Sequence, residues 1–201
     1  MSNAHKDPLV TDLAATVDYV RRVHEGGIDW YKVAEAKAQL LLTVSGLLIT
    51  LIFGMISGNL AEVSEFSKIA GVETWALFFI ATSAILGAVT CAAASLWSKH
   101  GTTIKVTFPA LGVDPVDPKT YTPEVLWYFG HLAHLEPKAA ASMISHADPG
   151  FEIKTLSYNV VRLSGIVLRK HRLINAGWAL GALALVSIVA AAASAFIRAQ
   201  G

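Results

Sequence analysis

Acidic residues are missing from the C-terminal part of this sequence. From Ile153 to Gly201 there is no Asp or Glu, so the cations of that stretch have no partner nearby in sequence. Charge is scarce elsewhere too, because only 15% of the 201 residues are charged, against roughly 25% in a typical soluble domain. With 54% hydrophobic residues and a net charge of +1, the composition indicates a membrane protein and does not favour a nucleic-acid polymer as partner.

Cysteine and enzyme signatures are nearly absent as well. Cys91 is the only cysteine, which excludes an intrachain disulfide and a multi-cysteine metal site. There is no Walker A motif, no GxGxxG, no GxSxG and no carboxylate pair in a plausible cleft, so we expect neither catalysis nor a cofactor. The first 27 residues carry mixed charge and no uninterrupted apolar run, so no cleavable signal peptide is predicted.

Long apolar runs are what the sequence does have. Three of them reach the about 20 residues that a helix needs to cross a bilayer, and none contains a charged residue. They are 39–57 (QLLLTVSGLLITLIFGMIS), 75–97 (WALFFIATSAILGAVTCAAASLW) and 173–197 (LINAGWALGALALVSIVAAAASAFI). Because no ionisable residue lies in mid-span, a proton-coupled transporter and a pore lined by charge are not expected.

The charges of the connections predict the orientation of the spans. The 57–74 connection has one cation against three glutamates, the 98–172 connection holds nine Lys and Arg residues, and the C-terminal tail has only Arg198. The positive-inside rule then places the N-terminus and the 98–172 connection in the cytoplasm and the C-terminus outside. Trp75 and Trp97 bracket the second span, as interfacial anchors do.

These features predict an all-α integral membrane protein with three transmembrane helices, a cytoplasmic N-terminal helix and a cytoplasmic helical insert. The expected parts are an amphipathic helix over 1–28, the first two spans over 29–97, the insert over 98–172, and the third span with a short external tail over 173–201. The pair Gly26-Gly27 is expected to end the first helix, and a second helix is expected to start near Asp29 and continue into the first span.

The insert is expected to be mostly helical. Residues 103–108, TIKVTF, alternate apolar and polar side chains, which is typical of a short extended segment. Residues 123–135, PEVLWYFGHLAHL, are expected to form one helix, and Pro137 starts a shorter helix that ends near His146. From Phe151 the chain is expected to be helical into the third span.

The last helix carries its arginines on one face. At about 100° per residue, spacings of four, three, four and three bring together Tyr158, Arg162, Gly165, Arg169 and Arg172. Guanidinium groups suit phosphate, and a tyrosine ring offers a stacking surface for a base. Topology anchoring with contact to anionic lipid headgroups explains such a face most simply. Two further interpretations stay open: binding of an anionic ligand, and pairing between subunits. Lys170 and His171 flank the apolar stripe of this helix instead.

Two histidines of the insert are further candidates. His131 and His134 lie three residues apart in YFGHLAHLE, with Glu136 close behind, and a metal-dependent membrane enzyme using these residues is one open hypothesis. No glutamate stands between the histidines as in the HExxH motif, so we assign no metal and expect a packed or ligand-facing role. The aromatic residues at 127–129 are more typical of a core than of a base-stacking platform.

Small residues in the spans predict close helix packing, within or between subunits. Two small-xxx-small motifs, GMISG and GWALG, and the small face of the second span supply them: Gly54, Gly58, Gly177, Gly181, Ala84, Gly87, Ala88 and Cys91.

Three blocks of the sequence resemble the family of Pycsar-type bacterial transmembrane effectors. Residues 30–48, WYKVAEAKAQLLLTVSGLL, resemble the helix that enters the first span in that family. Residues 128–135, YFGHLAHL, and 158–178, YNVVRLSGIVLRKHRLINAGW, are similar to its later blocks. The resemblance covers the chain from about Asp29 to Leu185. The matching positions are Lys37, Ala38, Phe129, Gly130, Leu163, Ser164, Lys170 and Leu173.

What the resemblance implies is a role in antiphage defence. In that family a partner cyclase makes a cyclic pyrimidine mononucleotide, cCMP or cUMP, on infection, and the effector impairs the bacterial inner membrane. A homo-oligomer is expected in the lipid bilayer. The resemblance supplies no binding residues, so the ligand assignment to the arginine face, with His131 and His134, comes from the residues themselves. Since the sequence has no cyclic-nucleotide-binding β-barrel, the helical insert must do the sensing. The alternative is a constitutive membrane scaffold that senses nothing.

Overall fold

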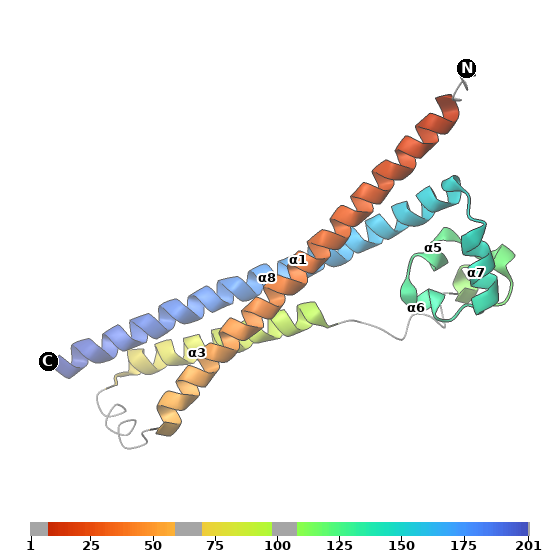
Figure 1. Ribbon diagram of the computed structural model, residues 1–201. Helices are drawn as coiled ribbons and strands as arrows, with labels where there is room; N and C mark the ends of the chain where they lie inside the picture. The colour runs from red at the N-terminus through yellow and green to blue at the C-terminus, as the bar shows by residue number, and fades with distance from the viewer. Residues whose placement is uncertain (1–7, 59–69, 98–107, 201) are drawn as a thin grey trace. The chain divides into compact units, whose positions relative to one another are not determined.

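The described part of the chain is helical. The structure, a computed structural model, describes residues 8–58, 70–97 and 108–200, and within the first of these ranges it leaves out the side chains of 8–11, 55, 56 and 58. These ranges contain helices, turns and no strand (Figure 1). The all-α class predicted above is confirmed.

The chain divides into two compact units. The insert unit comprises Met1–Tyr31 and Ser98–Val167, and the span unit comprises Lys32–Trp97 and Leu168–Gly201. Two long helices contribute to both units: α1, Pro8–Gly58, and α8, Pro149–Gln200. The units are described separately below.

The span unit contains the three predicted membrane spans. They lie in α1, in α3 (Val72–Leu96) and in α8, and all three helices are long and apolar enough to cross a membrane. This confirms that the chain has three helices long and apolar enough to span a membrane, while the span bounds 39–57, 75–97 and 173–197 stay predictions. Large apolar side chains point outwards from all three helices, as a lipid-facing surface requires. Examples with more than half of their surface exposed are Leu47, Phe53, Phe79, Leu86, Val186 and Phe196.

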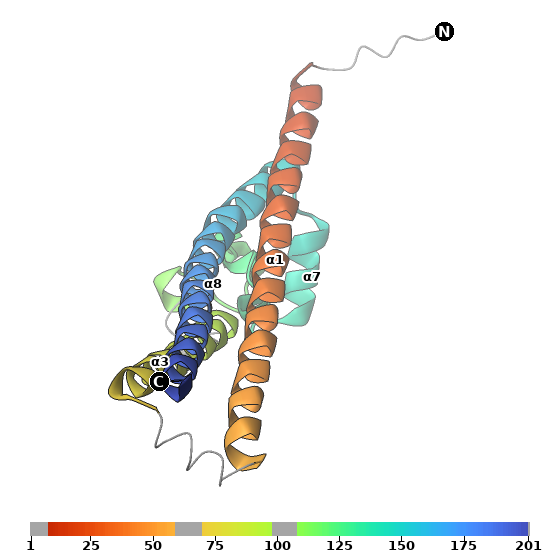
Figure 2. The ribbon, with the colours of Figure 1, turned by 90° about the vertical axis from the view of Figure 1, so that its left-hand side faces the viewer.

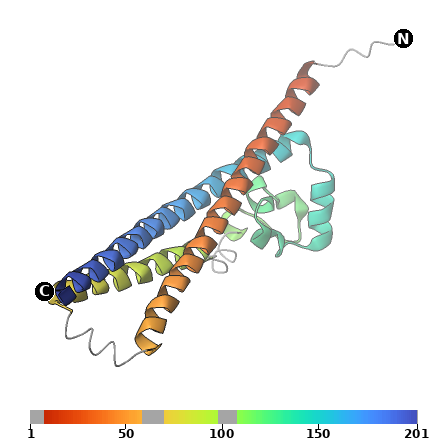
Figure 3. The same ribbon diagram turned by 60° about the vertical axis from the view of Figure 1, so that its left-hand side comes forward.

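Contacts with α8 define the direction in which each span runs. Beside α8, Glu35 of α1 pairs with Lys170, and farther along both helices Leu48 of α1 packs with Ala184, so α1 and α8 run parallel (Figure 2). The Thr74 hydroxyl at the start of α3 lies 3.0 Å from that of Ser194 near the end of α8. Leu96, at the other end of α3, packs near Ile174. Helix α3 is therefore antiparallel to α8, beside which it lies in Figure 3.

The helix break predicted at Gly26-Gly27 is wrong, because α1 continues through both glycines. A glycine inside a helix costs about 1 kcal/mol relative to alanine, which packing can offset. A Cβ on Gly27 would lie 3.0 Å from Leu163 Cδ2, so α8 packs closely at this position. Tertiary contact with α8 thus holds the helix intact where local propensity favours a break.

Polar contacts reinforce the pairing of α1 with α8 in the insert unit. Arg21 donates two hydrogen bonds to the Glu152 carboxylate, from Nε at 2.7 Å and from a terminal nitrogen at 2.9 Å. This contact raises the pKa of Arg21 above its ordinary value. One turn farther on, His24 Nε2 lies 3.0 Å from Asn159 Nδ2. These contacts hold one face of α8 against α1, so a different face of α8 meets the remaining elements of the insert unit.

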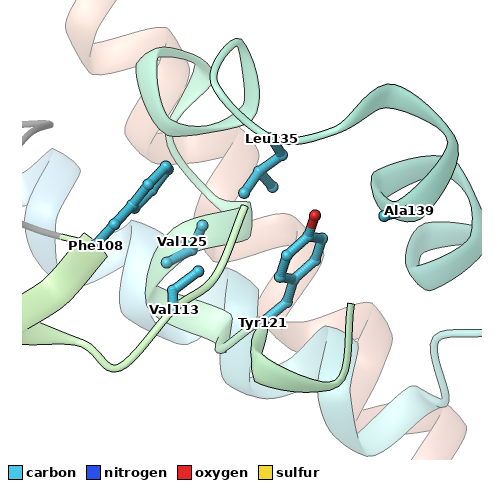
Figure 4. Close-up of a cluster of buried hydrophobic side chains, with 6 residues drawn as sticks. All are labelled: Phe108, Val113, Tyr121, Val125, Leu135 and Ala139. Carbon is cyan, nitrogen blue, oxygen red and sulfur yellow. The ribbon is translucent and has the colours of Figure 1, made fainter. Parts of the chain in front are cut away.

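The insert has a small hydrophobic core of its own, shown in Figure 4. It is built from Phe108, Val113, Tyr121, Val125, Leu135 and Ala139. Around it lie the one-turn 3-10 helix η1 (Pro118–Thr120) and the helices α5 (Pro123–Leu126), α6 (Phe129–Leu132) and α7 (Pro137–Ser145). The Glu136 carboxylate accepts a hydrogen bond from the Ala139 amide at 2.6 Å and so caps α7.

One of the helices predicted for the insert needs correction. Residues 123–135 do not form one helix: α5 ends at Leu126, and α6 starts at Phe129 after the extended residue Tyr128 (φ −109°, ψ 121°). The helix predicted from Pro137 is confirmed as α7. The extended segment predicted at 103–108 lies outside the described residues except for Phe108, which is helical.

Candidate functional site

Helix α8 presents three polar residues to the insert unit on one face. Thr155, Tyr158 and Arg162 are spaced three and four apart, so a helix brings them to the same side. Tyr158 is half-buried and its ring centroid lies 5.9 Å from that of Trp127, with 52° between the planes. Arg162 is exposed. The face therefore combines an aromatic contact to the insert with an accessible guanidinium group.

The junction of α5 and α6 supplies a series of aromatic rings. The ring centroids of Trp127 and Tyr128 are 5.3 Å apart, and Tyr128 meets His131 edge-on at 5.1 Å. Gly130 makes this possible, since a Cβ there would lie 2.5 Å from Tyr128 Cε1. Trp127 and Tyr128, which the sequence predicted as core residues, thus connect α8 to His131 through ring contacts.

His131 is the most buried of the predicted ligand residues. It is 7% exposed, and its ring also packs against Phe108 at 5.7 Å. Burial lowers the pKa of His131 below its ordinary 6.5, a hydrogen bond to the Glu124 backbone opposes this, and the charges of Arg162 and His134 add to the lowering. The imidazole is therefore neutral near pH 7. Its Nδ1 has no hydrogen-bond partner within the described part of the protein.

His134 and Glu136 are engaged elsewhere. His134 is exposed, and its Nδ1 lies 2.8 Å from the Gly130 carbonyl oxygen, while the Glu136 carboxylate caps α7. Among the described residues no group of three or more His, Cys, Asp or Glu is placed to hold a metal ion.

The remaining arginines of the predicted face, Arg169 and Arg172, belong to the span unit and are exposed. Neither these two nor Arg162 forms an ion pair with any residue that the structure describes. Lys170, by contrast, is 8% exposed, and its ammonium donates to Glu35 at 2.9 Å. The separation of Lys170 from the arginines, which the helical spacing predicted, is thus present in the structure.

The predicted packing glycines fall into two groups. A Cβ on Gly177 would lie 2.5 Å from Leu41 Cδ2, and one on Gly87 would lie 2.9 Å from Leu180 Cδ1, so both allow close helix contact. A Cβ on Gly181 would make an ordinary contact at 3.9 Å, and one on Gly54 would meet no atom within 4 Å. The surroundings of Gly58 are outside what the structure describes.

Sequence reasoning missed three polar residues as site candidates: two at the ends of α5 and one on α8. Buried polar atoms without a hydrogen-bond partner in the described structure include Thr122 Oγ1, Trp127 Nε1 and Thr155 Oγ1. Thr155 lies three residues before Tyr158, and helical spacing alone places it on the arginine face. Thr122 is the N-cap residue of α5, and nothing in the sequence shows that its hydroxyl is left without a partner. For Trp127 no sequence pattern carries a signal either, because its position depends on the break between α5 and α6.

Comparison with known families identifies the chain. The family described as the Pycsar effector protein domain matches residues 19–197, which extends beyond both ends of the resemblance seen between Asp29 and Leu185. No curated protein and no solved structure matches the chain. The match covers the insert unit's aromatic junction and all three candidate membrane spans. The chain therefore belongs to the Pycsar effector family, and it is a membrane effector of antiphage defence rather than a cyclase.

Proposed function

We propose that a cyclic pyrimidine mononucleotide, cCMP or cUMP, activates this effector, and that the active protein oligomerises and impairs the bacterial inner membrane. A nucleotide cyclase would supply the ligand on infection. Family membership supports the signalling role. The accessible, chemically suited side chains of the insert unit support a ligand site in that unit.

The observation that carries this proposal is the pairing of Arg162 with the aromatic contact beside it. A cyclic mononucleotide has one phosphate anion and one flat base. Arg162 is exposed, has no ion-pair partner among the described residues, and lies one turn from Tyr158, whose ring contacts Trp127. A guanidinium group binds phosphate with charge-assisted hydrogen bonds, and the rings offer a surface for the base.

The other predicted ligand residues contribute in different ways. His131 lies next to the aromatic rings, and His134 is exposed at the end of α6. Arg169 and Arg172 are on the part of α8 that belongs to the span unit, and their contact with the anion stays a prediction. Because the acid-free stretch after Ile153 includes all three arginines, each is available to an external anion.

Activation requires the ligand to bind one state of the protein more tightly than another. We propose that the free protein is a closed form, and that ligand binding in the insert unit favours an oligomer with altered spans. The two helices shared by the units, α1 and α8, support this route, since a change in either helix reaches both units. Small residues such as Gly54, at which an added Cβ would meet no atom within 4 Å in the described structure, are candidates for contact between copies.

Calorimetry on the detergent-purified full chain tests the ligand assignment. The wild type should bind cCMP or cUMP, and Arg162→Gln should weaken that binding by about ten- to a hundredfold, the worth of a charge-assisted hydrogen bond. Arg22→Gln is the matched control, because Arg22 is an exposed arginine of α1 in the same unit. If the wild type produces no heat with either nucleotide, the sensing proposal fails.

A constitutive scaffold remains the competing function, and expression in cells separates the two. Toxicity that rises only when an active cyclase is co-expressed is the result expected of an effector. Membrane depolarisation, followed with a potential-sensitive dye, should rise at the same time. Harmless co-expression with a cyclase whose product the protein binds would favour the scaffold.

A further inference from the structure

Unsatisfied polar atoms of the insert unit gather on the elements that meet at one junction. Within the described part of this unit, four buried side-chain atoms have no hydrogen-bond partner. They are Thr122 Oγ1, Trp127 Nε1, His131 Nδ1 and Thr155 Oγ1. Folded proteins satisfy the large majority of their buried polar groups, and leaving one unpaired costs about 1–3 kcal/mol. Trp127 and His131 are connected through ring contacts with Tyr128, and Thr155 shares a helix face with Tyr158, whose ring contacts Trp127. Unpaired atoms on residues connected in this way point to a partner from outside the chain.

His131 is the strongest indication among them. The residue is more than nine-tenths buried, between the rings of Phe108 and Tyr128. A neutral imidazole has one donor nitrogen and one acceptor nitrogen, and burial favours the neutral form here.

The contacts between the rings join these atoms to the anion-binding residue. The ring of Trp127 touches that of Tyr158, and Tyr158 shares its helix face with Thr155 and Arg162. The charge of Arg162 also contributes to lowering the pKa of His131. Unpaired hydrogen-bonding groups therefore accompany an aromatic surface and a free cation.

We infer that the two kinds of group divide the ligand: His131 Nδ1, Trp127 Nε1 and Thr155 Oγ1 hydrogen-bond the edge of the pyrimidine base, while Arg162 binds the phosphate. This inference rests on the proposed function and assigns its specificity. A pyrimidine edge carries a carbonyl acceptor next to groups that donate or accept. The indole N–H only donates, whereas the neutral imidazole and the hydroxyl also accept, so the set complements such an edge.

Replacing a residue whose polar group is kept unpaired for a ligand should weaken ligand binding without lowering the stability of the free protein. Removing the Thr155 hydroxyl with the isosteric Thr155→Val change eliminates an unsatisfied buried group, so the free protein should unfold at the same or a higher temperature. The same change should weaken cCMP or cUMP binding by about three- to tenfold, the worth of a neutral hydrogen bond. Thr16→Val is the matched control, since the Thr16 hydroxyl already donates to the Asp12 carbonyl on α1.

Calorimetry with two probes then separates the halves of the site. The probes are the nucleotide that the wild type binds and the base-free cyclic ribose phosphate. We expect Thr155→Val and His131→Phe to weaken the nucleotide and leave the base-free probe unchanged, and Arg162→Gln to weaken both. Circular dichroism confirms that each variant is folded, and Thr155→Val alone decides the question if His131→Phe is not.

The outcomes distinguish this inference from the proposed function. If the wild type binds neither nucleotide, the proposed function fails and the inference with it. If the wild type binds but Thr155→Val binds equally well, the inference alone is wrong and Thr155 merely holds ordered water. Equal weakening of both probes by Thr155→Val also overturns it, because a loss of structure and not of base contact would then be responsible.

Discussion

At the scale of single residues, burial controls the protonation of His131. The folded protein lowers the pKa of this imidazole below 6.5, chiefly because burial disfavours the charged ring. The unfolded chain has no such burial and takes up the proton at the ordinary pKa. Protonation of His131 and folding of the insert therefore oppose each other.

This opposition predicts a pH dependence of stability. Well above pH 6.5, His131 is neutral in the folded and in the unfolded chain, and the folded state has its full stability. As the pH falls through 6.5 toward the lowered pKa, the unfolded chain binds the proton first and stability decreases. Thermal unfolding of the wild type between pH 7.5 and about 5 should show the decrease, and His131→Gln should make it smaller. An identical slope in the variant would contradict the assignment.

Glycine positions in the spans give a second prediction at the residue scale. Gly177→Ala puts a Cβ 2.5 Å from Leu41 Cδ2 and 3.4 Å from the Ala88 carbonyl oxygen, and Leu41 is 1% exposed. Overpacking of this kind costs about 1–3 kcal/mol. Gly54→Ala is the matched control, since its Cβ meets no atom within 4 Å. Unfolding in detergent should begin at a lower temperature only for Gly177→Ala; equal losses would show that the two positions pack alike.

At the scale of elements, the pairing of α1 with α8 depends on a buried charge. Lys170 on α8 has a 10% exposed side chain and pairs with Glu35 on α1, whose side chain is 38% exposed. Ala34, Ala38 and Ile174 form a buried apolar cluster on the same two helices. An unpaired charge in such surroundings is costly, so the ion pair helps to hold α1 and α8 in register.

A double-mutant cycle checks this role. Glu35→Gln leaves the buried ammonium group without its carboxylate, and we expect a loss of about 1–3 kcal/mol, since the exposure of Glu35 reduces the full effect of removing one partner of a buried pair. Adding Lys170→Met should restore most of the stability, because no buried charge then remains. Thermal unfolding of both single variants and the double variant measures the coupling. Additive losses would show that the pair is energetically independent.

At the scale of the whole molecule, the three candidate spans run in alternating directions, and we expect them to place the two termini on opposite sides of the membrane. The contacts of α3 with α8 run antiparallel, and those of α1 with α8 run parallel. Which terminus is cytoplasmic follows from the positive-inside rule applied to the cations of 98–172. It remains a prediction of the sequence.

Reporter fusions test that orientation. An alkaline phosphatase domain fused after Gly201 should be active, because that enzyme folds only outside the cytoplasm. The same domain fused before the N-terminus should be inactive, while a green fluorescent protein at that position should fluoresce. The reversed pattern would contradict the expected N-in, C-out topology and would remove the insert from the cytoplasm, where the ligand is made.

The sequence by itself determined the helical class, the three spans and the separation of Lys170 from the arginine face. The spans depend on long apolar runs, which hydropathy detects. The separation of Lys170 from the arginine face depends on helical spacing, which follows from a period of 3.6 residues. Family-specific blocks around the first and last spans likewise predicted the family whose match covers residues 19–197.

Tertiary structure alone decided the rest, because it depends on residues far apart in the chain. Packing of Gly27 against Leu163 keeps α1 unbroken, and Glu35 meets Lys170 across 135 residues. The unsatisfied atoms of Trp127, His131 and Thr155 become a candidate site only because α5 and α6 separate at Tyr128 and the Trp127 ring reaches α8. Local propensity carries no information about which buried groups end without a partner, since that depends on every neighbour that the fold brings to them.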